Sequence, residues 1–268
     1  MKNKIRGEFI LKFLIVGDVC GRPGREAFRK YVPELKKEHN IDVVVVNGEN
    51  IAGGRGISRK TLDEIYRAGA DIVTSGNHIW DQKEIVSFID DEPFLIRPAN
   101  YPEGAPGKGY CIYPFKAKNI GVINVSGRTF MPPMDCPFQK VDEILKEIKN
   151  QCDIILVDIH AEATSEKIAM GFYLDGRVTC VVGTHTHVQT ADNRILPKGT
   201  AYISDLGMVG PDNSSLGINV NNAIDKFITC RPVRFEMAEG PNIFSAVVLE
   251  LAEDNSVKSF ERILFNEE

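Results

Sequence analysis

Cys180-Val-Val-Gly-Thr-His-Thr-His187 closes an apolar run with two histidines that lie two residues apart. In an extended segment, residues i and i+2 point to the same side of the backbone. We therefore expect His185 and His187 to face one point in space, as neighbouring ligands of a metal ion must. The chain has five histidines, and four of them close an apolar run or the turn after it. Histidines placed at random would be scattered along the chain, so this placement indicates that the four have a common role.

The same arrangement recurs upstream, where short apolar runs typical of buried strands end in glycine or a polar turn. With the run at 178–182, the runs cover 13–16, 43–46, 71–74 and 153–157. Metal-ligand residue types follow them directly, namely Asp18, Glu49, Asn50, Asn77, His78, His160, His185 and His187. Ligands of α/β sheets bind beyond the carboxyl ends of the strands, so these positions can meet at one edge.

Segments with helical spacing separate the apolar runs in the first part of the chain. We expect helices at 25–37, 59–68, 82–89, 141–149, 165–174 and 219–228, with Asp81 capping the third and 21–24 forming a turn before the first. Strands predominate later, at 201–203, 245–251 and 257–264. This order predicts an α/β fold with one mixed sheet or two stacked sheets covered by helices.

Length and composition set the class of protein. The 268 residues contain no linker-like or low-complexity stretch, so we expect one domain at 11–268, with 1–10 as an extension or an upstream start. A formal net charge of -5 argues against a stable nucleic-acid complex or an anionic membrane as the main partner. The six cysteines are far apart, and neither a signal peptide nor a membrane span is recognisable. A cytoplasmic location is expected, and a homo-oligomer is left open.

The residue types delivered by the apolar runs indicate a site with two metal ions. They offer three imidazoles, two carboxylates and one or two amide oxygens, too many for one tetrahedral zinc. Two ions sharing a carboxylate can hold a hydroxide between them and present it to a phosphoryl centre. Mixed nitrogen and oxygen ligands suit iron, manganese or zinc better than calcium. The expected partner is therefore a small anionic molecule of the phosphodiester class.

His78 is expected to act on the substrate rather than on a metal ion. It adjoins Asn77 in a turn, so its ring can reach a substrate atom and protonate the departing alkoxide. The alternative is a structural partner of Asp81. In the loop 126–130, Arg128 and Phe130 are candidates to grip the phosphate or the base, and otherwise the loop is structural.

Longer strings of the chain resemble calcineurin-like metallophosphoesterases, and within them the YmdB-like branch. The resemblance covers the chain from about Phe13 onward and rests on these strings: Gly17-Asp-Val-Cys-Gly-Arg-Pro-Gly24, Asn47-Gly-Glu-Asn-Ile-Ala-Gly-Gly54, Gly76-Asn-His-Ile-Trp-Asp-Gln82, His160-Ala-Glu-Ala-Thr-Ser-Glu-Lys167 and Val182-Gly-Thr-His-Thr-His-Val-Gln-Thr-Ala-Asp192. It implies a four-layer αββα sandwich, two mixed sheets flanked by helices, with a dinuclear metal centre that is often iron.

The resemblance also implies how the ligands divide. One ion would be held by Asp18, Glu49, Asn50 and His187, and the other by Glu49, Asn77, His160 and His185. Two positions depart from the wider superfamily: Cys20 stands where many members carry a histidine, and Glu49 stands where the bridging residue is usually Asp. Asn50 is expected to replace the missing imidazole, and Cys20 is expected to be a small buried residue rather than a ligand. Both departures are typical of the YmdB-like branch.

The predicted function is hydrolysis of 2',3'-cyclic nucleotides such as 2',3'-cAMP by a metal-bridged hydroxide, with His78 as general acid. The cyclic substrate follows from the resemblance alone. One alternative is a phosphomonoesterase or nuclease built on the same metal pair. Another is a nucleotide-binding regulatory protein with residual hydrolysis.

Overall fold

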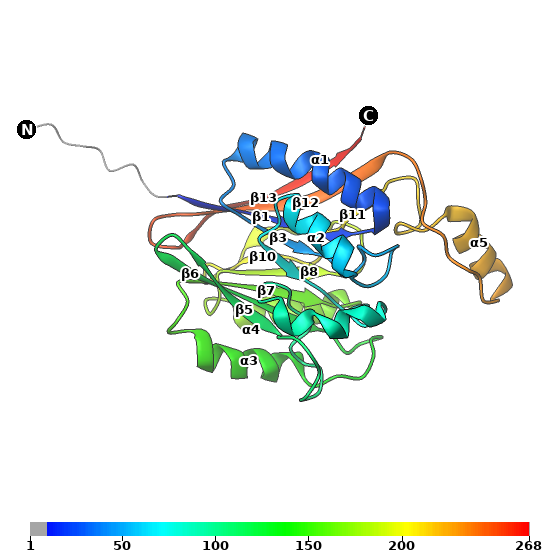
Figure 1. The fold of residues 1–268 in the computed structure, drawn as a ribbon. Helices are drawn as coiled ribbons and strands as arrows, with labels where there is room; N and C mark the ends of the chain where they lie inside the picture. The colour runs from blue at the N-terminus through cyan, green and yellow to red at the C-terminus, as the bar shows by residue number, and fades with distance from the viewer. Residues whose placement is uncertain (1–9, 268) are drawn as a thin grey trace, which may run out of the picture.

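Two mixed β-sheets form the centre of the computed structural model, which describes residues 10–267 (Figure 1). Within these residues the first sheet has seven strands in the order β2-β11-β12-β1-β3-β4, with β13 paired to β12. Its strands are β1 (Leu11–Val16), β2 (Asp18–Val19), β3 (Val43–Asn47), β4 (Ile72–Thr74), β11 (Met208–Pro211), β12 (Asn242–Leu251) and β13 (Val257–Asn266). The second sheet has the order β5-β6-β7-β8-β10-β9. Its strands are β5 (Tyr110–Phe115), β6 (Lys118–Ser126), β7 (Ile154–His160), β8 (Cys180–Thr184), β9 (Arg194–Ile195) and β10 (Ala201–Ile203).

Helices cover the outer face of each sheet, so the chain forms the expected four layers. Figure 1 shows α1 outside the first sheet and α3 outside the second. The helices are α1 (Gly21–His39), α2 (Arg59–Arg67), α3 (Pro137–Ile148), α4 (Thr164–Leu174) and α5 (Val220–Thr229). Side chains of β1 alternate, since Leu14 packs toward the helices α1 and α2 whereas Phe13 packs toward the second sheet. The four-layer prediction is confirmed.

Parallel pairing brings the carboxyl ends of the central strands to one edge. In the first sheet β1 and β3 are parallel, as are β3 and β4, and in the second sheet β6, β7 and β8 are parallel. The run 43–46 is buried on both faces, which is why it is continuously apolar rather than alternating. Polar residues that follow these strands therefore emerge on the same side of the molecule.

Three predicted helices differ from the structure. α3 begins at Pro137 rather than at 141, because proline fits the first turn of a helix. α1 begins at Gly21, so the expected turn at 21–24 is its first turn; Pro23 is tolerated there because the first backbone N–H groups of a helix have no partner within it. The predicted helix 82–89 is two 3-10 helices, Lys83–Ser87 and Ile89–Asp91, with Gln82 at the first N-terminus. Asp81 does not cap it, because the Asp81 carboxylate bonds instead to His78 Nδ1 at 2.9 Å.

The predicted extension at 1–10 lies outside the described residues except for Ile10, which precedes β1 without regular structure. Among the residues that are described, no helix combines the length and the apolar character needed to cross a membrane.

Glu267 joins the end of β13 to α1 and to the start of β12. Its carboxylate accepts hydrogen bonds from Lys30 Nζ at 3.0 Å, from the Tyr31 hydroxyl at 3.1 Å and from Asn242 Nδ2 at 2.6 Å. Although burial opposes it, these bonds, led by that from Asn242, lower the pKa of Glu267 from 4.5 to about 2. Because its pKa is lower in the folded protein than in the unfolded chain, this carboxylate stabilises the fold at pH values above 4.5. That contribution to stability is lost as the pH falls toward 2.

Replacing this carboxylate by an amide, Glu267→Gln, should lower the Tm at pH 7 by about 2–5 °C. The difference from wild type should stay constant down to pH ~5 and shrink below it, because the unfolded carboxyl then begins to take up a proton. Thermal melts followed by circular dichroism between pH 7 and pH 3 measure this. Glu253→Gln, at an exposed turn position between β12 and β13, is the matched control and should change the Tm little. A Tm difference that persists undiminished at pH 3 would contradict the assignment.

Candidate metal centre

The structure brings together the side chains that the sequence placed after five strands. Asp18 follows β1, Glu49 and Asn50 follow β3, Asn77 and His78 follow β4, His160 ends β7, and His185 and His187 follow β8. The strands belong to both sheets, whose carboxyl ends meet at this edge. Direct contacts link all of these residues into one cluster, as the following distances show. That they bind metal ions stays a prediction.

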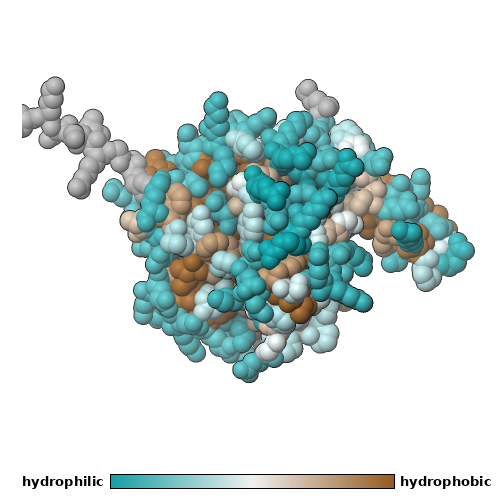
Figure 2. Space-filling view, in the orientation of Figure 1, coloured by the Kyte–Doolittle hydropathy of each residue, from teal (hydrophilic) through white to brown (hydrophobic). Residues whose placement is uncertain are grey.

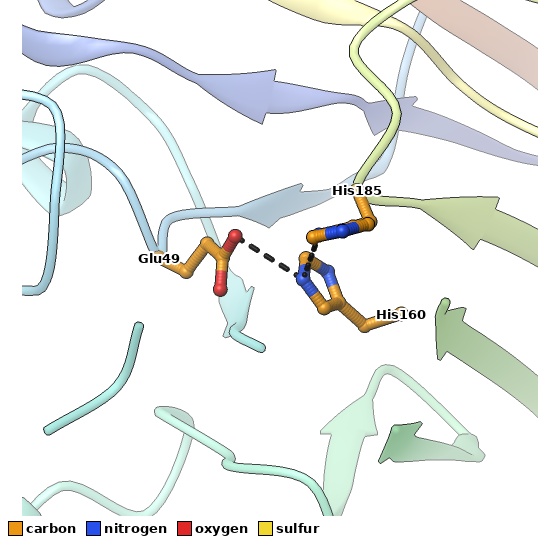
Figure 3. A group of neighbouring side chains, drawn as sticks. All are labelled: Glu49, His160 and His185. Atoms are coloured by element: carbon orange, nitrogen blue, oxygen red, sulfur yellow. Dashed lines mark hydrogen bonds and ion pairs between the residues drawn. The ribbon is translucent and has the colours of Figure 1, made fainter. Parts of the chain in front are cut away.

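The first group of contacts converges on one atom, His160 Nε2 (Figure 3). Figure 3 draws two of its neighbours, His185 Nδ1 at 3.0 Å and Glu49 Oε1 at 3.2 Å. The third neighbour is Asn77 Oδ1 at 2.9 Å. His160 and Glu49 are almost completely buried. A ring nitrogen carries at most one proton, so it cannot satisfy three such neighbours, and lone pairs are left facing one another. A cation among these atoms would satisfy all four.

Hydrogen bonds on the far side of each ring fix which nitrogen faces the group. Thr184 Oγ1 donates to Asp158 Oδ1 at 2.8 Å, so it must accept from His160 Nδ1 at 3.0 Å. His160 Nε2 is then the nitrogen with a free lone pair. In the same way Glu162 Oε2 lies 3.1 Å from His185 Nε2, which leaves His185 Nδ1 free. Ligand histidines in metal sites are held by partners of this kind.

A second group lies beside the first and contains Asp18, Asn50 and His187. His187 Nε2 is 3.2 Å from Asn50 Nδ2 and 3.7 Å from Asp18 Oδ1, while His187 Nδ1 is 3.1 Å from the Leu216 carbonyl. Within the described residues, the buried Asp18 Oδ1 has no hydrogen-bond partner. Asn50 Nδ2 also donates to Glu49 Oε1 at 3.2 Å, which joins the two groups.

Asn50 presents its amide nitrogen to the centre, whereas the sequence predicted an oxygen ligand. The two ends of an Asn side chain have nearly the same shape, so a half-turn of the amide would bring Oδ1 to the same place. Cys20 Sγ lies 3.7 Å from His187 Nδ1, on the side of the ring that faces away from Asp18. This position agrees with the expectation that Cys20 is not a ligand.

The expectation that His185 and His187 face one point is wrong. β8 ends at Thr184, and both histidines have positive φ, 99° for His185 and 65° for His187. The backbone is therefore not extended there, and the two rings reach different groups. Left-handed backbone is costly for these residues and persists only when surrounding contacts enforce it.

A buried ion pair supplies such contacts. Asp205 Oδ2 accepts from Thr186 N at 3.1 Å and from Thr186 Oγ1 at 2.7 Å, between the two histidines. Lys167 Nζ lies 2.6 Å from the same oxygen, and both charged side chains are 1% exposed. The Asp205 carboxylate is thus committed to holding the loop 185–187.

Burial and mutual charge shift the pKa values within the centre. Burial raises the pKa of Asp18 to about 7. Burial works against ionisation of Glu49 too, but the His160 ring beside it lowers the Glu49 pKa to about 2. Burial, with His160 as neighbour, lowers the pKa of His185 to about 3, so this ring is neutral at physiological pH. A neutral imidazole and ionised carboxylates are the forms that bind metal ions, so the shifts of Glu49 and His185 favour metal binding whereas the shift of Asp18 opposes it.

His78 borders the centre without joining either group. Its backbone N–H donates to Glu49 Oε2 at 3.0 Å, and its Nδ1 bonds Asp81 Oδ2 at 2.9 Å. Its side chain is 23% exposed. The ring is therefore oriented by Asp81, with Nε2 left for another partner, so the two roles weighed for His78 are compatible.

The predicted substrate residues lie in a loop that begins beside His160. Gly127 N donates to the His160 carbonyl at 2.9 Å, and Arg128 N donates to Glu166 Oε1 at 3.0 Å. The Phe130 side chain is 90% exposed. The loop is thus near the centre, but no contact among the described residues joins the Arg128 or Phe130 side chain to the metal-ligand candidates. Their role stays a prediction.

Sequence reasoning named Asp81 as a possible partner of His78 but missed the other residues that orient the candidate site. These are Asp158, Glu162, Lys167, Thr184 and Asp205. The available signal was their position: Asp158 and Glu162 flank His160 at a spacing of two, and Thr184 precedes His185. Which of them would meet which ring depends on packing between the sheets.

Comparison with known proteins identifies relatives of the whole chain. Residues 14–263 match the family model described as YmdB-like protein. A 2',3'-cyclic-nucleotide 2'-phosphodiesterase of Bacillus subtilis (strain 168) is 51% identical over 260 residues, which cover 96% of this chain and 98% of that protein. A crystal structure described as a novel phosphatase of Mycoplasma pneumoniae superposes with a TM-score of 0.92 at 35% identity, covering 97% of this chain and 95% of that one.

A third similar protein is found among the solved structures. The crystal structure of a hypothetical protein from Thermus thermophilus superposes with a TM-score of 0.91 at 40% identity, covering 96% of this chain and all of the other. The similarity is therefore not confined to the motifs, since it spans both sheets and their helices. The chain belongs to the YmdB-like protein family.

Proposed function

We propose that this protein is a metal-dependent phosphodiesterase that hydrolyses 2',3'-cyclic nucleotides. The observation that carries the proposal is the convergence of Glu49, Asn77 and His185 on His160 Nε2, at distances of 2.9–3.2 Å. Such a set of lone pairs is typical of a cation site. Because β3, β4, β7 and β8 all contribute to it, the convergence also supports residues 11–268 as a single catalytic domain.

The donor set fits a pair of metal ions. Glu49, Asn77, His160 and His185 would hold one ion, and Asp18, Asn50 and His187 the other, with Glu49 shared. The ligand atoms of Glu49, His160 and His185 all lie within 4.8 Å of one another. The mixture of nitrogen and oxygen donors suits iron, manganese and zinc alike, and iron is proposed because the resemblance to metallophosphoesterases implies it. When bound, two such ions neutralise charge on phosphoryl oxygens and lower the pKa of a water nucleophile.

His78 would supply the proton for the leaving oxygen. Asp81 holds Nδ1 at 2.9 Å, and the backbone N–H is fixed on Glu49, so the ring has a defined direction at the rim of the centre. A proton on Nε2 can then pass to an alkoxide that leaves phosphorus. Proton donation of this kind contributes about 10²–10⁴-fold to a rate.

The substrate class follows from the relative in Bacillus subtilis, whose name specifies 2',3'-cyclic nucleotides and the 2' bond. By analogy the bond to O2' would break here and a nucleoside 3'-phosphate would be released. A cyclic diester also suits one nearby acid, because a single P–O bond must break and the leaving oxygen stays tethered. Arg128 and Phe130 are proposed to contact the phosphate or the base.

A cytoplasmic location belongs to the same proposal. All six cysteines are free, and Cys111 and Cys180 are buried. Free thiols in a chain of this length are typical of a reducing compartment.

The direct test combines metal analysis with a substrate panel. We expect protein purified without added metal to contain close to two ions per chain and to convert 2',3'-cAMP to 3'-AMP, resolved by chromatography. A chelator should remove both metal and activity, and iron, manganese or zinc should restore them. Activity on 5'-AMP or linear dinucleotides in preference to the cyclic substrate would replace the proposal by a phosphomonoesterase or a nuclease. If the protein contains metal but turns over none of these substrates, the proposal would be replaced by a nucleotide-binding protein.

The acid role of His78 can be separated from metal binding. His78→Ala should lower kcat on 2',3'-cAMP by about 10²–10⁴-fold while the metal content stays at the wild-type level. Asp81→Asn is the matched control, since it keeps the ring but weakens its orientation, and its kcat should fall less. Loss of metal from His78→Ala would make His78 a ligand instead.

A further inference from the structure

A basic groove between α1 and α2 lies apart from the candidate metal centre. It encloses about 480 Å³ and is hereafter the α1–α2 groove. Its charged lining consists of Arg22, Arg25, Arg29, Lys60 and Arg67 with Glu26 and Glu64. Five cationic side chains thus face two carboxylates. None of these residues is among the candidate metal ligands.

Both carboxylates of the groove are already paired with arginines. Arg22 Nε lies 2.8 Å from Glu26 Oε1, and Arg25 Nε lies 2.7 Å from Glu64 Oε2. They therefore cannot neutralise the remaining cations.

Two cations of the groove are left without an internal partner. Arg67 lies 3.6 Å from Asp63, which is outside the lining. Across residues 10–267, neither Arg29 nor Lys60 forms a hydrogen bond or an ion pair with another side chain. Their charges are nonetheless felt inside the groove: the hydrogen bond from Arg25 lowers the pKa of Glu64, and the charges of Lys60 and Arg29 act in the same direction.

This local charge contrasts with the rest of the protein. The whole chain has a formal net charge of -5, so a concave cluster of cations is not explained by a generally basic surface. Figure 2 shows strongly hydrophilic side chains over α1 and α2. Concave surfaces lined by one sign of charge concentrate oppositely charged ligands. The groove is therefore suited to an anion.

The chemistry of the lining specifies the class of anion. Arginine and lysine side chains are the residues that bind phosphate groups, arginine through two parallel N–H donors. The volume of about 480 Å³ is within the range of small-molecule sites. None of the described lining residues is aromatic, so nothing in the groove is placed to stack on a base. We propose that the α1–α2 groove binds a small anion with two or more phosphate groups, with Arg29 and Lys60 as its main contacts.

The floor of the groove touches the loop that carries Glu49 and Asn50. The Arg25 guanidinium donates a hydrogen bond to the Ile51 carbonyl, and Gly21 N donates to the Asn50 carbonyl at 2.9 Å. The α1–α2 groove and the candidate metal centre thus border the same loop. Binding there is independent of the proposed catalytic function and is tested without it.

Isothermal titration calorimetry with tripolyphosphate tests the proposal, on protein with its metal content intact and in excess magnesium so that the ligand does not strip metal. The variant Arg29→Gln/Lys60→Gln should bind about tenfold more weakly or worse than wild type. Lys37→Gln/Lys83→Gln, which removes two exposed cations outside the groove, is the charge-matched control and should bind as wild type does. Binding at the metal centre would be common to all three proteins.

Two further measurements complete the test. Arg29→Lys/Lys60→Arg keeps both charges and should retain the wild-type Kd within about threefold, which guards against a folding defect. Titration of ATP distinguishes a nucleotide from an inorganic phosphate chain as the ligand. If ATP and tripolyphosphate bind with equal affinity, the groove recognises the phosphate chain alone. If ATP binds more tightly, the ligand is a nucleotide. An unchanged Kd in Arg29→Gln/Lys60→Gln, or an equal loss in Lys37→Gln/Lys83→Gln, would overturn the proposal.

Discussion

Gly76→Ala is expected to abolish metal binding and catalysis together. A Cβ atom at this position would lie 2.4 Å from Glu49 Oε2 and 2.4 Å from His160 Nε2. Neither side chain can retreat easily, because both are almost completely buried. Displacing reacting or ligating groups by about 1 Å costs on the order of 10²-fold in rate, so kcat/KM on 2',3'-cAMP should fall by at least that factor.

The second readout for Gly76→Ala is the metal content per chain, measured by inductively coupled plasma mass spectrometry. It should fall well below wild type, and it reports on the centre even if the substrate is not a cyclic nucleotide. Gly199→Ala is the control, since a Cβ there meets no atom within 4 Å. It should cost about 1 kcal/mol of stability through its positive φ and leave metal and activity unchanged. Full metal loading of Gly76→Ala would show that Glu49 and His160 do not jointly hold an ion.

Lys167→Met should have the largest effect on stability. The substitution leaves the Asp205 carboxylate, 1% exposed, without the ammonium group that lies 2.6 Å away. Removing one partner of a buried ion pair costs about 3–5 kcal/mol. For a protein of this size that corresponds to a Tm drop on the order of 10 °C, measured by circular dichroism or scanning calorimetry.

The double variant Lys167→Met/Asp205→Asn separates the lost pair from lost packing. Asn keeps an oxygen that can accept from Thr186, but it removes the unpaired charge. The double variant should therefore be more stable than Lys167→Met alone. If the two substitutions acted independently, their losses of stability would add and the double variant would be the less stable of the two. Because Thr186 lies between His185 and His187, Lys167→Met should also lower metal content. A Tm within about 2 °C of wild type would contradict the role given to the pair.

The positions of the candidate ligands were predictable because they follow from strand burial. A strand buried on both faces must be apolar, and the first polar residues after it lie at the sheet edge. For that reason Asp18, Glu49 and His160 could be placed without coordinates. The start of α1 could not, because glycine and proline at 21–24 are typical of a turn and also fit the first turn of a helix.

The sequence by itself determined the α/β class and the residues gathered at the sheet edge, because apolar runs and their ends are local properties. The four layers were implied only by the family resemblance. Tertiary structure alone decided how those residues pair. His185 and His187 separate because both have left-handed backbone, while Asp205, paired with Lys167, holds Thr186 between them. Likewise Arg29 and Lys60 share a groove only because α1 packs beside α2. Such contacts depend on distances between segments remote in the chain, which no local pattern encodes.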